Sequence, residues 1–145
     1  MSSQRLQRYA DFFEQLTPEA LDAFDRVLTA DARFKDPFND VRGLPAIRRI
    51  FAHMYAVTEA PRFTVLGMAE SADTGYLHWE MQFALRRRPA RIWRIEGMSR
   101  LCFAEDGRVR EHVDFWDPLE SLLTRLPLVG ALFRLPVRLL RTPQS

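Results

Sequence analysis

YLHWEMQFALR, residues 76–86, decides the fold, because its side chains alternate between apolar and polar along the stretch. Successive side chains of a β-strand point to opposite faces of the sheet, so this alternation predicts a strand with one buried and one solvated face. The apolar face carries Leu77, Trp79, Met81, Phe83 and Leu85. The opposite face carries Tyr76, His78, Glu80, Gln82 and Ala84.

The neighbouring segments extend this pattern into a sheet. Residues 62–72 are typical of a strand, and residues 91–103 alternate as residues 76–86 do. Glu105-Asp106-Gly107 is typical of a hairpin turn, which predicts a last strand over residues 108–117. Together these segments predict an antiparallel sheet with one apolar face.

Upstream of the sheet, the apolar side chains recur at helical spacing. Residues 5–16 form one such stripe, and Thr17-Pro18-Glu19 predicts the start of a second helix that ends near Leu28. A short extended piece, residues 32–36, precedes a third helix that opens at Gly43-Leu44-Pro45. Helices followed by an antiparallel sheet predict an α+β domain.

Composition limits the classes of protein that fit. The 145 residues suffice for one domain with a core, and the net charge of +2 does not favour a nucleic-acid partner. Cys102 is the only cysteine, so no disulfide is expected. Nearly all basic residues are arginine, which favours a bacterial source. The first residues lack the apolar run of a signal peptide, and we expect a cytoplasmic protein.

Residues 118–145 are expected to form an apolar helical extension of a domain that spans residues 1–117. Prolines and arginines interrupt the apolar run at 126–140, which excludes a membrane-spanning helix. A solvated tail would expose too many leucines. The extension therefore closes one end of the domain, packs in a dimer interface, or lies on a membrane surface with its arginines toward the headgroups.

Three segments resemble the nuclear transport factor 2-like superfamily, which includes ketosteroid isomerases and SnoaL-like polyketide cyclases. They are RYADFF (8–13), ARFKDPFNDVRGLPAIRRIF (32–51) and FAEDGRVREHVDFWDP (103–118). The resemblance implies a cone-shaped fold, with three N-terminal helices on a curved antiparallel sheet and a small-molecule pocket inside. It also implies a homodimer formed through the convex face of the sheet.

The resemblance suggests roles for two residues of the N-terminal half. Asp36 matches the ketosteroid isomerase aspartate that moves a proton next to a ketone, although an aspartate before a proline also caps turns. Tyr9 follows Arg8 as the oxyanion-hole tyrosine of that enzyme follows an arginine. The alternative for Tyr9 is a position at the edge of the core.

The last strands supply the other candidates. Ser99 stands where ketosteroid isomerase has a protonated aspartate, so it is a weaker oxyanion donor and steroid isomerisation is not expected. His112, Asp114 and Trp116 alternate and so share one face. A buried histidine and carboxylate are costly unless they are paired or used. His112 with Asp114 therefore forms either a second acid/base or a structural pair, unless the strand faces outward and leaves both in solvent.

We expect the pocket to be lined by apolar side chains of the sheet, with Asp36 near its mouth or its floor. The predicted lining is Trp79, Phe83, Trp93, Ile95, Leu101 and Trp116, with Ser99 among them. We expect no metal, because Asp36, His112 and Asp114 include no pair at helical i,i+4 spacing and the superfamily's hydrolytic chemistry is usually metal-free. No cofactor is expected either.

Two functions remain open. One is a cofactor-independent isomerase, cyclase or dehydratase that moves a proton on a small apolar ketone-like or polyketide-like substrate. The other is a non-catalytic domain that binds an apolar ligand in the same pocket. The arginine-rich turn at residues 86–91 is expected to be a solvated hairpin tip, with an anionic partner as the alternative.

Overall fold

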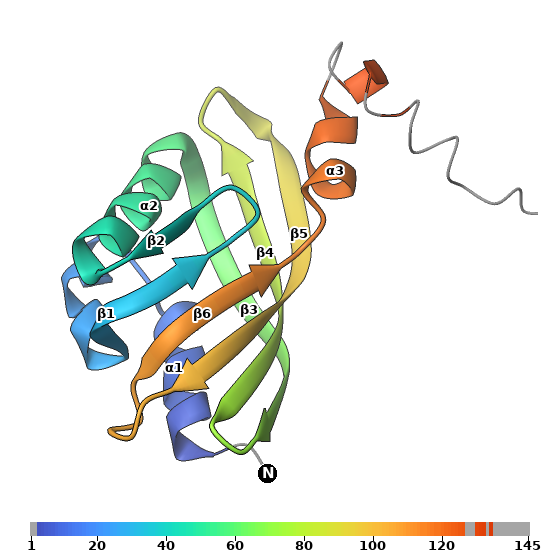
Figure 1. The fold of residues 1–145 in the computed structure, drawn as a ribbon. Coiled ribbons are helices and arrows are strands. Elements are labelled where there is room, and N and C mark those ends of the chain that lie inside the picture. Colours follow the sequence, from blue (N-terminus) through green and yellow to red (C-terminus); the bar gives the residue numbers. More distant parts are fainter. Residues whose placement is uncertain (1–2, 127–129, 133, 135–145) are drawn as a thin grey trace, which may run out of the picture.

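A computed structural model describes residues 3–126, 130–132 and 134 of the chain (Figure 1). One six-stranded sheet runs in the order β2-β1-β6-β5-β4-β3. Its strands are β1 (Leu28–Lys35), β2 (Asp40–Arg42), β3 (Thr58–Ser71), β4 (Thr74–Leu85), β5 (Arg88–Phe103) and β6 (Val109–Phe115). The predicted α+β class and the meander of the last four strands are confirmed.

The prediction of a purely antiparallel sheet is wrong for one pair of strands. β1 runs parallel to β6, with Phe34 opposite His112, so the sheet is mixed. The short edge strand β2 was also not predicted. Arg33 ties this corner together, because its guanidinium donates to Asp40 on β2 and to Glu111 on β6. Alternation along one strand indicates which of its faces is buried but not which strand lies next to it. The sequence therefore carries no local pattern that predicts the pairing of β1 with β6.

The helices are α1 (Gln4–Glu14), the 3-10 helix η1 (Pro18–Arg26) and α2 (Leu44–Val57). Figure 1 shows a strongly curved sheet with α1 and α2 on its inner side. η1 ends before the predicted Leu28, because Leu28 already pairs with Val109 of β6. The second helix is therefore shorter and more tightly wound than the sequence predicts.

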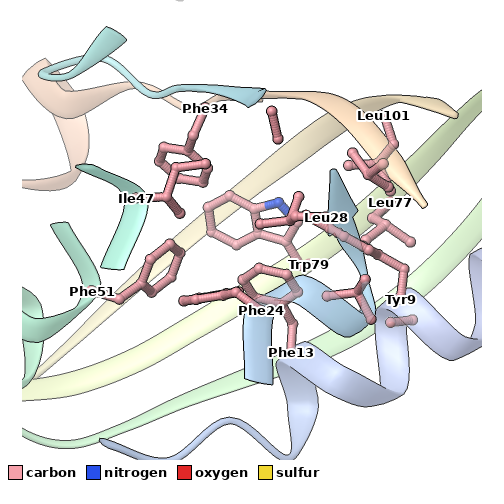
Figure 2. Packing of buried hydrophobic residues seen from close by; sticks show 14 of the residues in the cluster. Tyr9, Phe13, Phe24, Leu28, Phe34, Ile47, Phe51, Leu77, Trp79 and Leu101 are labelled. Atoms are coloured by element: carbon pink, nitrogen blue, oxygen red, sulfur yellow. The ribbon is translucent and has the colours of Figure 1, made fainter. Parts of the chain in front are cut away.

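The sheet register places the predicted apolar faces together. Trp79 lies opposite Gly97 and Phe83 opposite Trp93, and Trp79, Phe83 and Trp93 are all buried. This confirms that β4 and β5 present their apolar faces to the same side, which we call the inner face. Figure 2 shows Trp79 within a cluster that also contains Phe13, Phe24 and Phe51 from the helices.

After β6 the chain forms α3 (Pro118–Ser121) and η2 (Leu123–Arg125). Leu122 and Leu126 pack against the core, so the start of the C-terminal extension covers part of the domain. The rest of the predicted helical extension lies largely outside the described residues, and the boundary between residues 117 and 118 stays a prediction. Within the described part of the chain, no helix is long and apolar enough to cross a membrane.

Candidate functional site

An open groove of about 620 Å³ lies where the ends of β1 and β6 meet. Its walls come from the end of β1 and from the passage between β6 and α3. The lining residues are Lys35, Asp36, Pro37, Val113, Asp114, Phe115, Trp116, Asp117 and Pro118. The groove therefore brings together Asp36, Asp114 and Trp116 from the predicted site.

Four of the polar residues on the inner side form one hydrogen-bonded chain with Asp114. The Tyr9 hydroxyl lies 2.8 Å from Nδ1 of His112, and Nε2 of His112 lies 2.6 Å from Oδ1 of Asp114. The same Oδ1 accepts a hydrogen bond of 2.5 Å from the Ser99 hydroxyl. Nε1 of Trp79 donates to Ser99 Oγ at 2.8 Å. The chain thus begins in α1, crosses β6 and β5, and ends on β4.

The donors and acceptors fix the direction of every bond in this chain when His112 is neutral. The indole of Trp79 can only donate, so the Ser99 proton is available for Asp114. Because a carboxylate only accepts hydrogen bonds, His112 donates to Asp114 from Nε2. Its Nδ1 then accepts a hydrogen bond from the Tyr9 hydroxyl. Burial raises the pKa of Tyr9 well above its usual range, and the Asp114 charge raises it further. Tyr9 therefore remains a neutral donor.

Asp114 is the member of the chain that reaches the groove. Its side chain keeps 14% of its surface exposed, whereas the His112 side chain keeps 6%. Both hydrogen bonds to Asp114 end on Oδ1. No side chain or backbone group among the described residues donates to Oδ2. Asp114 therefore lines the groove with Oδ1 held by His112 and Ser99, while its Oδ2 has no donor among the described residues.

The close approach of the Trp79 ring to the backbone of β5 makes this geometry possible. Trp79 folds over Gly97, where an added Cβ would lie 2.6 Å from the indole ring and 3.0 Å from Cβ of Trp116. A glycine at this position leaves room for the indole ring beside β5, two residues from Ser99. Gly97 thus admits the ring, and the Ser99 hydroxyl accepts a hydrogen bond from its N–H.

Asp36 also lines the groove, but its oxygens are occupied by its own turn. Oδ1 accepts from the backbone N–H groups of Phe38 and Asn39 at 2.7 Å, and the Asn39 amide donates to both oxygens at 3.1 Å. This arrangement is the turn-capping alternative for an aspartate before a proline. Tyr9 is buried and bonded to His112 rather than open to the groove.

Most of the predicted pocket lining lies in the packed core. Trp79, Phe83, Trp93, Ile95 and Leu101 are all buried. Ser99 is buried as well, and Trp116 is the member of the predicted lining that borders the groove. The helices explain this difference, because their phenylalanines fill the inner side of the sheet, as Figure 2 shows for Phe13, Phe24 and Phe51.

Sequence reasoning missed Lys35 and Asp117, which border the groove. Their signal was available, since each is a charged residue adjacent to a predicted site residue, Asp36 or Trp116. Trp79 was expected as apolar lining, and its role as a hydrogen-bond donor had no sequence signal. Within the described ranges, no group of three His, Cys, Asp or Glu side chains is arranged to hold a metal ion.

The sequence profile of a family described as SnoaL-like domain matches residues 9–112. Among curated proteins none matches this sequence. Two solved bacterial structures share 16% identity with it. An NTF2-like protein of unknown function from Burkholderia pseudomallei K96243 has a TM-score of 0.72 and is matched over 82% of this chain and 95% of that chain. A protein named as a SnoaL-like polyketide cyclase from Jannaschia sp. CCS1 has a TM-score of 0.69 over 81% and 88%.

A third structure is named as an epoxide hydrolase-like protein from Mycobacterium tuberculosis. It shares 12% identity, with a TM-score of 0.65, over 92% of this chain and 94% of that chain. At these identities the likeness concerns the fold, which hosts differently named activities.

Proposed function

Because the chain belongs to the SnoaL-like domain family, we propose that it is a cofactor-independent proton-transfer enzyme of the isomerase, cyclase or dehydratase type. Its substrate is a small, largely apolar molecule with a ketone-like or polyketide-like carbonyl, bound in the groove beside Trp116. The neighbour named as a polyketide cyclase supports this class of substrate. The single observation that carries the proposal is that Asp114, a groove-lining carboxylate, is held through Oδ1 alone by His112 and Ser99.

In this proposal Asp114 is the base. Its Oδ2 accepts a proton from the carbon next to the substrate carbonyl, while His112 and Ser99 hold Oδ1 and keep the carboxylate plane fixed. A base that is positioned before the substrate arrives needs little rearrangement during proton transfer. Tyr9 acts through His112, because its hydroxyl fixes the orientation of the imidazole. Tyr9 and Ser99 are therefore positioning residues.

Lys35 supplies the positive charge of the proposed site. It is the cationic side chain among the groove-lining residues, which also include the carboxylates of Asp36, Asp114 and Asp117. An ammonium group near a developing enolate oxygen stabilises the negative charge that proton removal creates. Lys35→Arg preserves that charge and Lys35→Met removes it, so the pair of variants separates charge from bulk.

The experiment compares the wild type with Asp114→Asn and Asp36→Asn on ketosteroids and polyketide-like esters. An amide cannot accept the proton, so Asp114→Asn is expected to lose about 100- to 10,000-fold in turnover. Asp36→Asn is the matched control, because it makes the same change at a carboxylate in the same groove. Equal turnover by Asp114→Asn and the wild type excludes Asp114 as the base.

A second measurement, followed by the same turnover screen, distinguishes the non-catalytic alternative. Native mass spectrometry of the protein as purified identifies a ligand held in the groove, and that ligand joins the screen. A ligand that binds but is not converted by the wild type contradicts the enzyme and favours an apolar-ligand-binding domain.

A further inference from the structure

Two segments of this chain carry positive charge that no acidic residue in the same segment balances. Between Glu80 and Glu96 the sequence contains five arginines and no acidic residue. After Glu120 it contains four more arginines and again no acidic residue, among many leucines. Since the whole chain has a net charge of only +2, the remainder is negative. A molecule with this asymmetry is oriented by an anionic surface rather than attracted uniformly.

The first segment forms an exposed end of the molecule. Residues 86–92, which comprise the turn after β4 and the first residues of β5, are all exposed, and we call this segment with Arg62 the arginine tip. Arg62 lines a second groove, of about 460 Å³, together with Pro89 and Ile92. Arg62 therefore belongs to the same surface although it comes from β3.

Three guanidinium groups of the arginine tip have no partner in the described part of the protein. The side chains of Arg62, Arg87 and Arg88 make no hydrogen bond, ion pair or ring contact with the described residues. The other two arginines of the turn have internal roles, since Arg86 donates to the Tyr55 carbonyl and Arg91 lies over the Trp93 ring. Glu59 is the carboxylate among the residues that line the second groove. Its single negative charge does not balance the arginines, so the tip carries a net positive charge.

Aliphatic side chains are exposed beside these charges. Ile92 keeps 55% of its surface exposed and Val57 keeps 42%. Val57 is held next to the tip, because its carbonyl accepts from the Arg86 backbone N–H at 3.1 Å. Arginines mixed with exposed aliphatic groups match the headgroup and upper acyl region of an anionic bilayer. The tip exposes no aromatic side chain on which a nucleic-acid base could stack.

We propose that the arginine tip docks on the surface of a bilayer that contains anionic phospholipids, independently of the catalytic proposal. The second acid-free segment supports a lipid partner, because residues 121–145 repeat the combination of arginine with apolar residues.

The experiment uses the full chain and cosedimentation with vesicles. One set of vesicles is phosphatidylcholine alone, and the other is an equal mixture of phosphatidylcholine and phosphatidylglycerol. The test variant is Arg62→Gln/Arg87→Gln/Arg88→Gln, which removes three charges without breaking a described contact. The control variant is Arg26→Gln/Arg42→Gln/Arg49→Gln, which removes three exposed charges elsewhere and has the same net charge. Circular dichroism checks that both fold.

The wild type and the control variant are expected to sediment with the phosphatidylglycerol vesicles and not with phosphatidylcholine. The tip variant is expected to bind at least tenfold more weakly, and added salt weakens the binding of all three proteins. Equal loss in both variants would contradict the proposal, since binding would then follow net charge alone. Retention on heparin without binding to phosphatidylglycerol would also overturn it, and would assign the tip to a soluble polyanion.

Discussion

At the scale of a single residue, Ser99 links Trp79 to Asp114 through one hydroxyl group. Its hydroxyl accepts from the Trp79 indole and donates to Asp114, and it is 2% exposed. A buried donor that loses its partner keeps the full cost of its lost hydration. The value of Ser99 therefore lies in satisfying two other side chains at once.

Ser99→Ala is expected to destabilise the protein by about 1–3 kcal/mol, because it leaves the Trp79 N–H unpaired inside the core. Urea unfolding measures this change. Trp79→Phe removes the donor itself, so the double variant should cost less than the sum of the two single variants. Strict additivity would show that the hydrogen bond between Trp79 and Ser99 is not formed in solution.

Tyr9 gives a prediction for the dependence of stability on pH. Its pKa is raised by burial and by the Asp114 charge, so the folded state keeps the phenol proton at a pH where the unfolded state loses it. The contribution of Tyr9 is full below about pH 10, the ordinary pKa of tyrosine, and is lost as the pH rises above that value. Wild type should therefore lose stability above pH ~10 more steeply than Tyr9→Phe in parallel urea titrations. Parallel curves for the two proteins would contradict this.

At the scale of elements, the close packing of β4 on β5 positions the site. Gly97 leaves room for the Trp79 ring, and Gly67 on β3 offers a comparison, since the nearest atom to an added Cβ there is 3.9 Å away. The two glycines lie in the same sheet but differ in what covers them.

Gly97→Ala is expected to cost about 1–3 kcal/mol, because the new methyl group displaces the indole from the strand. Near-ultraviolet circular dichroism should report the changed surroundings of Trp79. Gly67→Ala is the matched control and should change the spectrum little. A normal spectrum and unchanged unfolding free energy in Gly97→Ala would show that the ring does not rest on β5.

At the scale of the whole molecule, the side of the sheet opposite the inner face, which we call the outer face, is a candidate surface for contact with another protein molecule. It carries polar pairs, such as His78 with Glu96 at 2.6 Å, beside the exposed side chains of Met98 and Phe115. Met98 lies opposite Phe115 on β6 and opposite His78 on β4. An exposed apolar pair flanked by polar side chains suits a contact with a second copy of the chain.

We predict a homodimer through this face. Met98→Asp should shift the protein from a dimer toward the 17.0 kDa monomer in sedimentation velocity at micromolar concentration. Val57→Asp is the control, because it places the same charge on an exposed residue at the end of α2 rather than on a strand of this face. A wild type that sediments only as the monomer would refute the prediction.

The sequence predicts those features that depend on local pattern. Alternation in residues 76–86 and 91–103 predicts β4, β5 and their shared buried face. The spacing of His112 and Asp114 places both on one side of β6, and Trp116 follows directly after this strand. Contacts between distant segments carry no such pattern. The parallel pairing of β1 with β6, the bond from Tyr9 to His112 and the filling of the inner side by phenylalanines depend on tertiary packing.

The central claim is that Asp114 removes a proton from a bound carbonyl compound, and hydrogen–deuterium exchange tests it without knowledge of the product. A ketone that binds the wild type is incubated with each protein in deuterated water, and NMR follows the loss of the protons next to its carbonyl. We predict that the wild type and Asp36→Asn catalyse this exchange and that Asp114→Asn does not. Exchange by Asp114→Asn at the wild-type rate would contradict the claim.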